Sequence, residues 1–224
     1  MVAWDYLNSE ISYGEFSDVR DDQVYKTVKI GNQTWMAENL NYSVNAGTQS
    51  WCGGGSGDEE GDCSEYGRLY TWAAAIDSVA LANDADDPLT CGYGVECTLP
   101  ATVQGICPSG WHLPDYEEWE ALITAVGGKD KAGKALKSQT GWTSFENLSA
   151  FTDDYGFSAL PAGRKYCGSS FKSVDDEAYF WSASLYKESK KWNAYYMSLR
   201  YSLFSANLDD ESKDNGYSVR CLKD

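Results

Sequence analysis

Apolar residues recur at helical spacing between residues 116 and 126. They are Tyr116, Trp119, Leu122, Ile123 and Val126. Asp115 precedes them as an N-cap and Glu118 follows three residues later, as a capping box requires, while Gly127 and Gly128 are typical of a helix end. The pattern predicts an amphipathic helix with one buried face, followed by a second, more polar helix over residues 129–139.

Short runs rich in aromatic and β-branched residues predict strands at both ends of the chain. Near the start, two such runs flank Gly31 and Asn32, a pair that suits a two-residue type II′ turn, so residues 24–40 are predicted to form a β-hairpin. The last third contains four runs separated by polar segments, at residues 155–166, 178–186, 192–201 and 216–224. Helices followed by strands, after an N-terminal hairpin, indicate an α+β fold with an antiparallel sheet.

The remaining stretches have no sustained period. Residues 1–22 are interpreted as an irregular leader, and residues 23–224 as a single domain. Residues 43–104 form a cysteine- and glycine-rich insertion within that domain, in which residues 69–83 have a helical pattern. The sequence contains no internal repeat, so one domain with an insertion is the expected organisation.

The charge of the chain bears on its partners. It has 18 basic and 34 acidic residues among 224, and its formal net charge is −16. Such a chain repels phosphate backbones and anionic bilayers at long range, so nucleic acid is not an expected partner. No apolar run approaches the roughly 18 residues that span a membrane, so membrane insertion is not expected either. The 9 Trp and 16 Tyr supply ring faces suited to cores and recognition surfaces alike.

Seven cysteines indicate the compartment. None lies in a CxxC motif and the chain has a single histidine, so disulfides are a better interpretation than a zinc site. Spacing suggests Cys52 with Cys63 and Cys91 with Cys97, and the remaining economical pair joins Cys107 to Cys221, although the sequence by itself leaves the connectivity open. Cys167 is left over, as a buried thiol or as a link to another chain. This cysteine usage predicts a location outside the cytoplasm, extracellular or at the cell surface.

Five segments, in this order, resemble the Fibrobacter succinogenes major paralogous domain of bacterial secreted and surface proteins. They are VKIGNQTWMAENLNY at residues 28–42, CPSGWHLPDYEEWEAL at 107–122, DDYGFSALPAGR at 153–164, YFWSAS at 179–184 and GYSVRCLKD at 216–224. The resemblance covers about residues 23–224. That family is similar to the C-type-lectin-like group, which includes retroelement-diversified binding proteins and formylglycine-generating enzymes. HLPDYEEWEAL looks like the LPTEAEWE pattern of that group.

The resemblance implies a C-type-lectin-like fold. Such a fold has two main helices beside a small twisted antiparallel sheet, termini that lie close together, and long irregular loops that carry function. Here the disulfide-stapled insertion would interrupt it. In such a fold the CPSGWHLP segment is the entrance to the first helix, and its cysteine bonds to the last strand.

Few residues suggest catalysis or metal binding. His112 is wedged between Trp111 and Leu113, with no nucleophile assigned to it, so a structural role is expected. The formylglycine-generating relatives use a cysteine pair and copper, and this chain departs from them because Cys167 and Cys221 are far apart. No cofactor is expected. Three acid-rich segments, 55–63, 83–88 and 208–215, could hold a structural calcium ion or could be solvated loops.

The candidate ligand-binding residues lie in the last third of the chain, around the loops after the second, third and fourth strands of its sheet. They are Tyr186, Trp192, Asn193, Tyr195, Arg200, Asp209 and Asp210. Aromatic faces beside amides and acids suit sugars or protein partners. We therefore expect a non-catalytic extracellular module for ligand binding or adhesion, with a polysaccharide or a surface protein as ligand. The alternative is a structural or assembly domain that uses Cys167, and a formylglycine-generating-like enzyme is the third interpretation.

Overall fold

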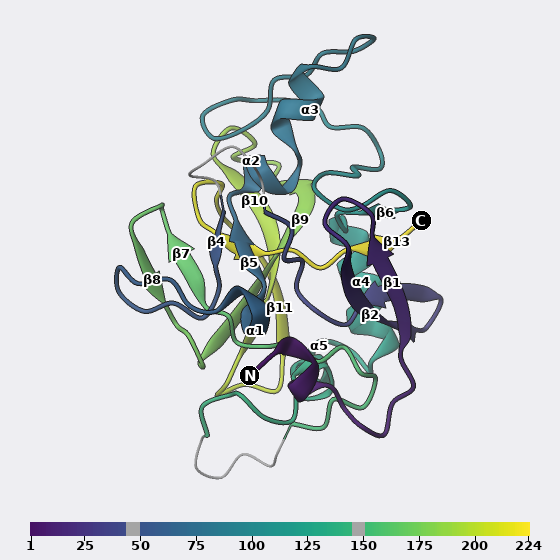
Figure 1. The fold of residues 1–224 in the computed structure, drawn as a ribbon. Helices are drawn as coiled ribbons and strands as arrows, with labels where there is room; N and C mark the ends of the chain where they lie inside the picture. The colour runs from purple at the N-terminus through teal and green to yellow at the C-terminus, as the bar shows by residue number, and fades with distance from the viewer. Residues whose placement is uncertain (44–49, 145–150) are drawn as a thin grey trace.

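The computed structural model describes residues 1–43, 50–144 and 151–224, and its architecture is mixed α+β (Figure 1). In the described part of the chain, strands form a five-stranded sheet, a six-stranded sheet and a separate hairpin. Residues 44–49 of the expected insertion lie outside the described residues.

The five-stranded sheet contains the predicted N-terminal hairpin. Its strands are β1 (Gly14–Asp18), β2 (Gln23–Ile30), β3 (Gln33–Met36), β6 (Trp111–His112) and β13 (Leu222–Lys223), in the order β1-β2-β3-β13-β6. Gly31 between β2 and β3 has a φ of 62°, which a type II′ turn requires at that position. The hairpin prediction is confirmed. β1 corrects the expectation of an irregular leader, because all five of its residues pair with β2; as a largely exposed edge strand it has no alternating pattern.

The six-stranded sheet occupies the centre of Figure 1. Its strands are β4 (Ser50–Cys52), β5 (Arg68–Tyr70), β9 (Glu177–Leu185), β10 (Asn193–Arg200), β11 (Ala206–Ser212) and β12 (Tyr217–Ser218), in the order β11-β10-β9-β12-β5-β4. The pairing of β12 with β9 is parallel and the others are antiparallel. β11 was not predicted: its acidic residues were interpreted as a loop, but it pairs with β10 at the edge of the sheet, where acidic side chains can reach solvent.

The separate hairpin consists of β7 (Arg164–Tyr166) and β8 (Ser170–Lys172). The strand expected at residues 155–166 is therefore limited to its last three residues. The fourth predicted run, residues 216–224, is divided between β12 and β13, so it contributes to both large sheets.

The helices are short except for two. They are η1 (Ala3–Tyr6), α1 (Cys63–Tyr66), α2 (Trp72–Ala75), α3 (Ser78–Ala82), α4 (Tyr116–Ala125) and α5 (Lys129–Leu136). The capping box at α4 is confirmed, since Asp115 accepts from the Glu118 N–H and Glu118 accepts from the Asp115 N–H. The single helix expected at 69–83 is wrong: β5 takes its start, and Asp77 in the left-handed region (φ 49°) separates α2 from α3.

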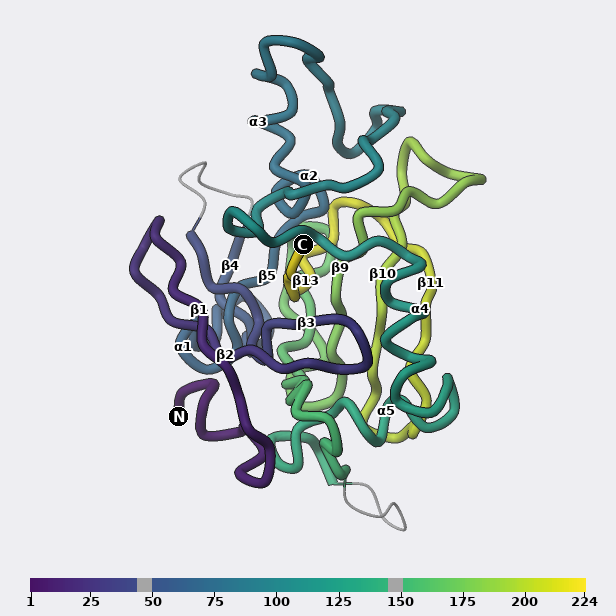
Figure 2. Tube along the Cα trace, turned by 90° about the vertical axis from the view of Figure 1, so that its right-hand side faces the viewer, coloured from purple at the N-terminus to yellow at the C-terminus, as the bar shows by residue number. Residues whose placement is uncertain are grey.

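Strand β9 is buried on both faces. Ala178 and Phe180 belong to a core cluster with residues of α4 and α5, while Tyr179 and Trp181 belong to a second cluster with Trp72 of α2. Successive side chains of a strand point to opposite faces, so β9 divides the interior into two cores. Figure 2 shows α4 and α5 beside β10 and β11, and α4 packs on β9, β10 and β11.

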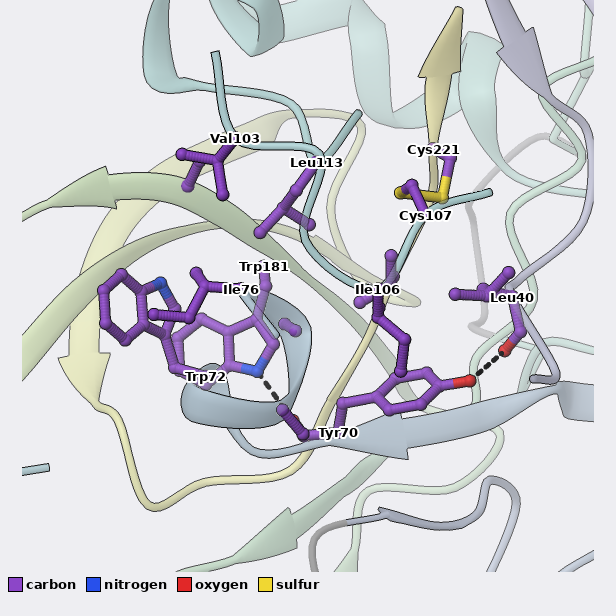
Figure 3. Packing of buried hydrophobic residues seen from close by; sticks show 14 of the residues in the cluster. Leu40, Tyr70, Trp72, Ile76, Val103, Ile106, Cys107, Leu113, Trp181 and Cys221 are labelled. Carbon is purple, nitrogen blue, oxygen red and sulfur yellow. Dashed lines mark hydrogen bonds between the residues drawn. A yellow bond between two sulfur atoms is a disulfide. The ribbon is translucent and has the colours of Figure 1, made fainter. Parts of the chain in front are cut away.

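Three disulfides join the predicted pairs, Cys52–Cys63, Cys91–Cys97 and Cys107–Cys221. The last spans 114 residues and ties the segment before α4 to the segment between β12 and β13, inside the second core (Figure 3). In the same core the Trp181 indole donates to the carbonyl oxygen of Tyr70 at 2.7 Å. Disulfides of this kind are typical of proteins that mature in an oxidising, extracellular environment.

Arg220, the residue before Cys221, has a fully buried guanidinium group between β12 and β13. Its acceptors are Asn39 Oδ1 and the main-chain carbonyl oxygens of Met36, Phe157 and Ser158. Burial lowers the pKa of Arg220 to about 9, and the nearby carboxylates of Glu38 and Asp153 oppose that shift, so the group stays charged at neutral pH. A buried cation with this many acceptors fixes the path of the chain between the two sheets.

His112 on β6 is held between two carboxylates. Its Nδ1 lies 2.7 Å from Asp224 Oδ1 and its Nε2 lies 2.9 Å from Glu118 Oε1. The hydrogen bond to Glu118, helped by Asp224, raises the pKa of His112 although burial opposes it. The histidine thus connects the end of the chain to the first turn of α4.

The two ends of the chain lie apart in both views (Figures 1 and 2), whereas the resemblance implied adjacent termini. The N-terminal residues before β1 lie near α1, where the amino group of Met1 is 3.8 Å from Glu65 Oε2. None of the helices in the described ranges has the length and apolar character that crossing a bilayer needs.

Replacing Cys107 and Cys221 together by serine is expected to lower the free energy of unfolding by about 4 to 5 kcal/mol, because this disulfide closes a long loop of the unfolded chain. The matched control replaces Cys91 and Cys97, whose short loop predicts a loss of about 2 to 3 kcal/mol. Denaturant unfolding measures both. Equal losses would contradict the assignment of the 107–221 bond as the main covalent constraint.

Replacing His112 by glutamine is expected to flatten the dependence of stability on pH. The raised pKa of His112 means that its contribution is fully present below about pH 6.5 and is lost as the pH rises through the folded-state pKa. The wild type should therefore lose stability relative to His112→Gln as the pH is raised from about 6 to 8.5. The difference between the two proteins isolates His112, because other groups titrate in both. A difference in the free energy of unfolding that does not change with pH would contradict the role of the His112 contacts with Glu118 and Asp224.

Candidate functional site

Three tyrosines meet where the start of α4 approaches β10 and the loop that precedes it. This tyrosine cluster consists of Tyr116, Tyr186 and Tyr195, all partly exposed. The ring centroids of Tyr116 and Tyr195 are 4.7 Å apart at 59°, and those of Tyr186 and Tyr195 are 5.5 Å apart at 87°. The cluster therefore presents ring surfaces at several inclinations instead of one flat platform.

Local geometry explains how these rings come together. Tyr116 is the first residue of α4, and its N–H donates to Ser184 Oγ on β9 at 3.0 Å. The register of β9 and β10 shifts between Ala194 and Tyr196, so Tyr195 lies in an irregularity of the sheet. Such irregularities re-aim a side chain, here toward the start of α4.

The polar groups beside the cluster come from neighbouring strands and the intervening loop. Asn193 Nδ2 donates to Asp210 Oδ2 at 2.8 Å, and the Tyr186 hydroxyl donates to Glu188 Oε2 at 3.1 Å. The hydrogen bond to Glu188 raises the pKa of Tyr186. Burial raises the pKa of Tyr195, and Asp210 and Glu188 raise it further, so the phenols stay neutral at physiological pH.

Trp192 forms a second aromatic surface with the insertion. Its side chain is 44% exposed and that of Tyr93 is 49% exposed, and their centroids are 4.9 Å apart at 64°. Gly94 donates its N–H to the Lys191 carbonyl oxygen at 2.9 Å. In Figure 2 the loop between β9 and β10 extends beside the segment that follows α3. The insertion is therefore part of the candidate site.

Lys213 fastens these two loops together. Its buried ammonium group donates to the carbonyl oxygens of Gly92, Val95 and Lys190. Burial lowers the pKa of Lys213 to about 8, so it is mostly charged at neutral pH. One cation thus holds the Cys91–Cys97 loop against the loop that carries Trp192.

Two clefts adjoin the tyrosine cluster. One, of about 240 Å³, lies between residues 97–103 and the end of β9, and Asp115, Leu185 and Lys190 also line it. The other, of about 270 Å³, runs between α4 and β11, with Tyr116, Glu120 and Leu208 among its lining residues. Tyr116 itself lines the second cleft, whereas the first is lined by Asp115 and Leu185, the sequence neighbours of Tyr116 and Tyr186.

The structure brings together four of the seven predicted ligand-binding residues, Tyr186, Asn193, Tyr195 and Asp210, while Trp192, next to Asn193 in the sequence, contacts Tyr93 of the insertion. The other two lie elsewhere. Arg200 is at the opposite end of β10, where its Nε is 3.1 Å from Glu177 Oε1. Asp209 pairs in register with Tyr196 and so points to the other face of the sheet from Asp210. Sequence proximity could not separate them, because neighbours on a strand alternate in direction.

The segments considered for calcium have other roles where they are described. Asp62 caps α1, Asp84 accepts from the N–H groups of Asp86 and Asp87, and most of segment 208–215 belongs to β11. Within the described ranges no group of three or more His, Cys, Asp or Glu side chains is arranged to hold a metal ion. His112 is not available as a base either, since both ring nitrogens face carboxylates.

Cys167 is unpaired, as the sequence analysis allowed, but it is exposed instead of buried. It lies in the turn between β7 and β8 with a φ of 42°, and its N–H donates to Asn215 Oδ1. Partial burial and then the carboxylates of Asp214 and Glu211 raise the pKa of its thiol. The thiol is therefore largely protonated at neutral pH, which slows its reactions.

Two members of the site were not predicted from the sequence. Tyr116 was assigned to the buried face of α4, but its position in the first turn places it beyond the core. Tyr93 was not considered, although an aromatic residue between glycines inside a short disulfide loop, CGYGVEC, is a signal for an exposed ring.

Comparison with known proteins gives the family. No curated protein and no solved structure matches the chain. Residues 28–223, which include every element from within β2 to β13, match the family model of the Fibrobacter succinogenes major domain. The chain belongs to the Fibrobacter succinogenes major domain family.

Proposed function

We propose that this chain is a non-catalytic extracellular module that binds a ligand, a polysaccharide or a surface protein, through the surface formed by the tyrosine cluster and Trp192. The observation that carries the proposal is the partly exposed tyrosine cluster, held in place by α4 and β10 and flanked by hydrogen-bonding groups. Exposed aromatic residues on a rigid scaffold are enriched at recognition surfaces.

Rigidity of the surrounding loops supports binding over a purely structural role. Lys213 and the Cys91–Cys97 disulfide hold the insertion against the loop of Trp192, so the aromatic groups are ordered before any ligand arrives. A preorganised surface loses less conformational entropy on binding, which favours affinity.

The absence of catalysis is part of the proposal. His112 is the only histidine, and both of its nitrogens are occupied by Glu118 and Asp224. A cysteine pair like that of the formylglycine-generating enzymes is not formed, because Cys221 bonds to Cys107 and Cys167 stands alone. These observations support a binding role over an enzymatic one.

We also propose a C-type-lectin-like scaffold and a location outside the cell or at its surface. The two longest helices, α4 and α5, pack beside the twisted sheet, and a disulfide ties the segment before α4 to the last strands. Three disulfides support an oxidising compartment.

Screening the oxidised protein on a glycan array and on surface proteins of cells that share its habitat tests the proposal. A Trp192→Ala variant is expected to lose binding by about 5-fold or more, because large rings at recognition surfaces contribute strongly. Its free energy of unfolding should fall by less than about 1 kcal/mol, since the ring is 44% exposed.

The matched control is Tyr166→Ala, which removes a 40% exposed ring from the separate β7–β8 hairpin and should leave binding unchanged. The array is run with calcium and again with chelator. Lack of any ligand in both screens, or equal losses in the two variants, would count against this surface as the site.

The alternative, an assembly domain, has the exposed thiol of Cys167 in its favour. A covalent link through Cys167 should appear as a dimer in non-reducing mass spectrometry and disappear in Cys167→Ser. We expect the monomer instead, because the raised pKa of this thiol disfavours its oxidation at neutral pH.

A further inference from the structure

Four carboxylates surround the tyrosine cluster from three directions. Glu117 and Glu120 are on α4, Glu188 is in the loop between β9 and β10, and Asp210 is on β11. Each lies close enough to raise the pKa of at least one cluster tyrosine. None of the four takes part in an ion pair within the described part of the chain. The cluster therefore combines aromatic rings with uncompensated negative charge.

The protein's own cations near this surface are lysines, and Lys187 stands between Tyr186 and Glu188 in the sequence. Lys129 lines the cleft between α4 and β11 that Glu120 also lines. Lys187, Lys190 and Lys191 belong to the loop between β9 and β10; Lys191 lies over the Trp192 ring at 5.6 Å, and none of the three forms an ion pair with the four carboxylates.

Hydrogen-bond acceptors outnumber donors at the cluster. Carboxylate oxygens accept only, and two of the donors are engaged, Asn193 Nδ2 with Asp210 and the Tyr186 hydroxyl with Glu188, which leaves the hydroxyls of Tyr116 and Tyr195. A sugar hydroxyl needs donors as well as acceptors around it. An ammonium group has three donors and no acceptor, so it matches what this surface offers.

Ring geometry agrees with the charge. The ring of Tyr195 is inclined by 59° to that of Tyr116 and by 87° to that of Tyr186. Rings at several inclinations can surround the end of a side chain, whereas a sugar stacks on one flat face. The face of an aromatic ring attracts a cation, and the aliphatic stem of lysine packs on the same apolar surface.

We propose that the tyrosine cluster and its four carboxylates bind the ammonium groups of lysine side chains in a basic segment of a partner protein. The inference rests on the proposed function and narrows its ligand from two classes to one. The net charge of −16 steers such a segment toward the protein over distances of about a Debye length. The adjoining cleft between α4 and β11, where Glu120 lies beside Tyr116, gives room for further residues of the segment.

The test uses pentalysine with acetylated and amidated ends, titrated into the oxidised full chain and followed by chemical shifts and calorimetry. Pentalysine is expected to bind, and its affinity should fall by about 5-fold or more between 25 and 200 mM salt, because exposed charges are screened. The same peptide with Nε-acetylated lysines keeps the stem and lacks the charge, so it should not bind.

Variants locate the binding. Tyr195→Leu and Glu188→Gln are each expected to weaken binding by about 3-fold, the size of one exposed cation–ring or ion contact. Tyr195→Phe keeps the ring and should retain binding, which separates recognition from misfolding. Glu59→Gln is the matched control: it removes the same charge from an exposed position between β4 and α1 and should change nothing.

Each other outcome overturns the inference in a defined way. Equal effects of Glu188→Gln and Glu59→Gln would mean non-specific attraction by the net charge. Stronger binding of a glucosamine tetramer than of pentalysine would assign the ammonium site to an amino sugar. A neutral ligand from the array that is sensitive to Trp192→Ala, together with no binding of pentalysine, would refute the inference and leave the proposed function intact. No ligand of either kind would refute both.

Discussion

The path of the chain between β12 and β13 is the constraint on which the rest of the structure depends. Tyr217 and Ser218 belong to the six-stranded sheet and Leu222 to the five-stranded one, so three residues carry the chain from one sheet to the other. Arg220 and Cys221 fix that crossing. The guanidinium has its acceptors at the end of β3, at Asn39 beyond it and on the segment before β7, and the sulfur bonds to the segment before α4. Loss of this crossing would separate the two sheets and release α4.

The contacts at this crossing also position the candidate site. The disulfide of Cys107 and the hydrogen bond of His112 with Glu118 fix the start of α4, and the first residue of α4 is Tyr116. On the sheet side of the tyrosine cluster, Phe180 of β9 and Met197 of β10 pack against the helices α4 and α5. Tyr195 lies on the same strand as Met197 and is positioned by this packing. The surface residues are therefore positioned by buried ones that a ligand would never contact, which is how a rigid scaffold can carry variable recognition surfaces.

Charge is distributed unevenly between interior and surface. Buried cations serve as ties: Arg220 joins the sheets and Lys213 joins two loops, each by donating to main-chain carbonyl oxygens. Carboxylates stay largely at the surface, where the tyrosine cluster collects four of them. An unpaired buried charge is costly, so the few buried cations need the many acceptors they have, whereas exposed acids repel one another and favour a cationic ligand.

The local features of this protein could be predicted from its sequence. The capping box at Asp115, the turn at Gly31, the two short-loop cysteine pairs and the four late strand-forming runs depend on short-range rules, and the structure agrees with them in large part. Features that depend on pairing between distant segments became known only from the tertiary structure. The acid-rich segment 206–212 is a strand because it pairs with the edge of β10. Arg200 lies outside the site because it is at the opposite end of β10, and Asp209 because its side chain points to the other face of the sheet. Tyr116 and Tyr93 belong to the site because they contact Tyr195 and Trp192, which are distant in the sequence. Bringing such distant residues together costs chain entropy, and local sequence patterns do not show whether the fold offsets that cost.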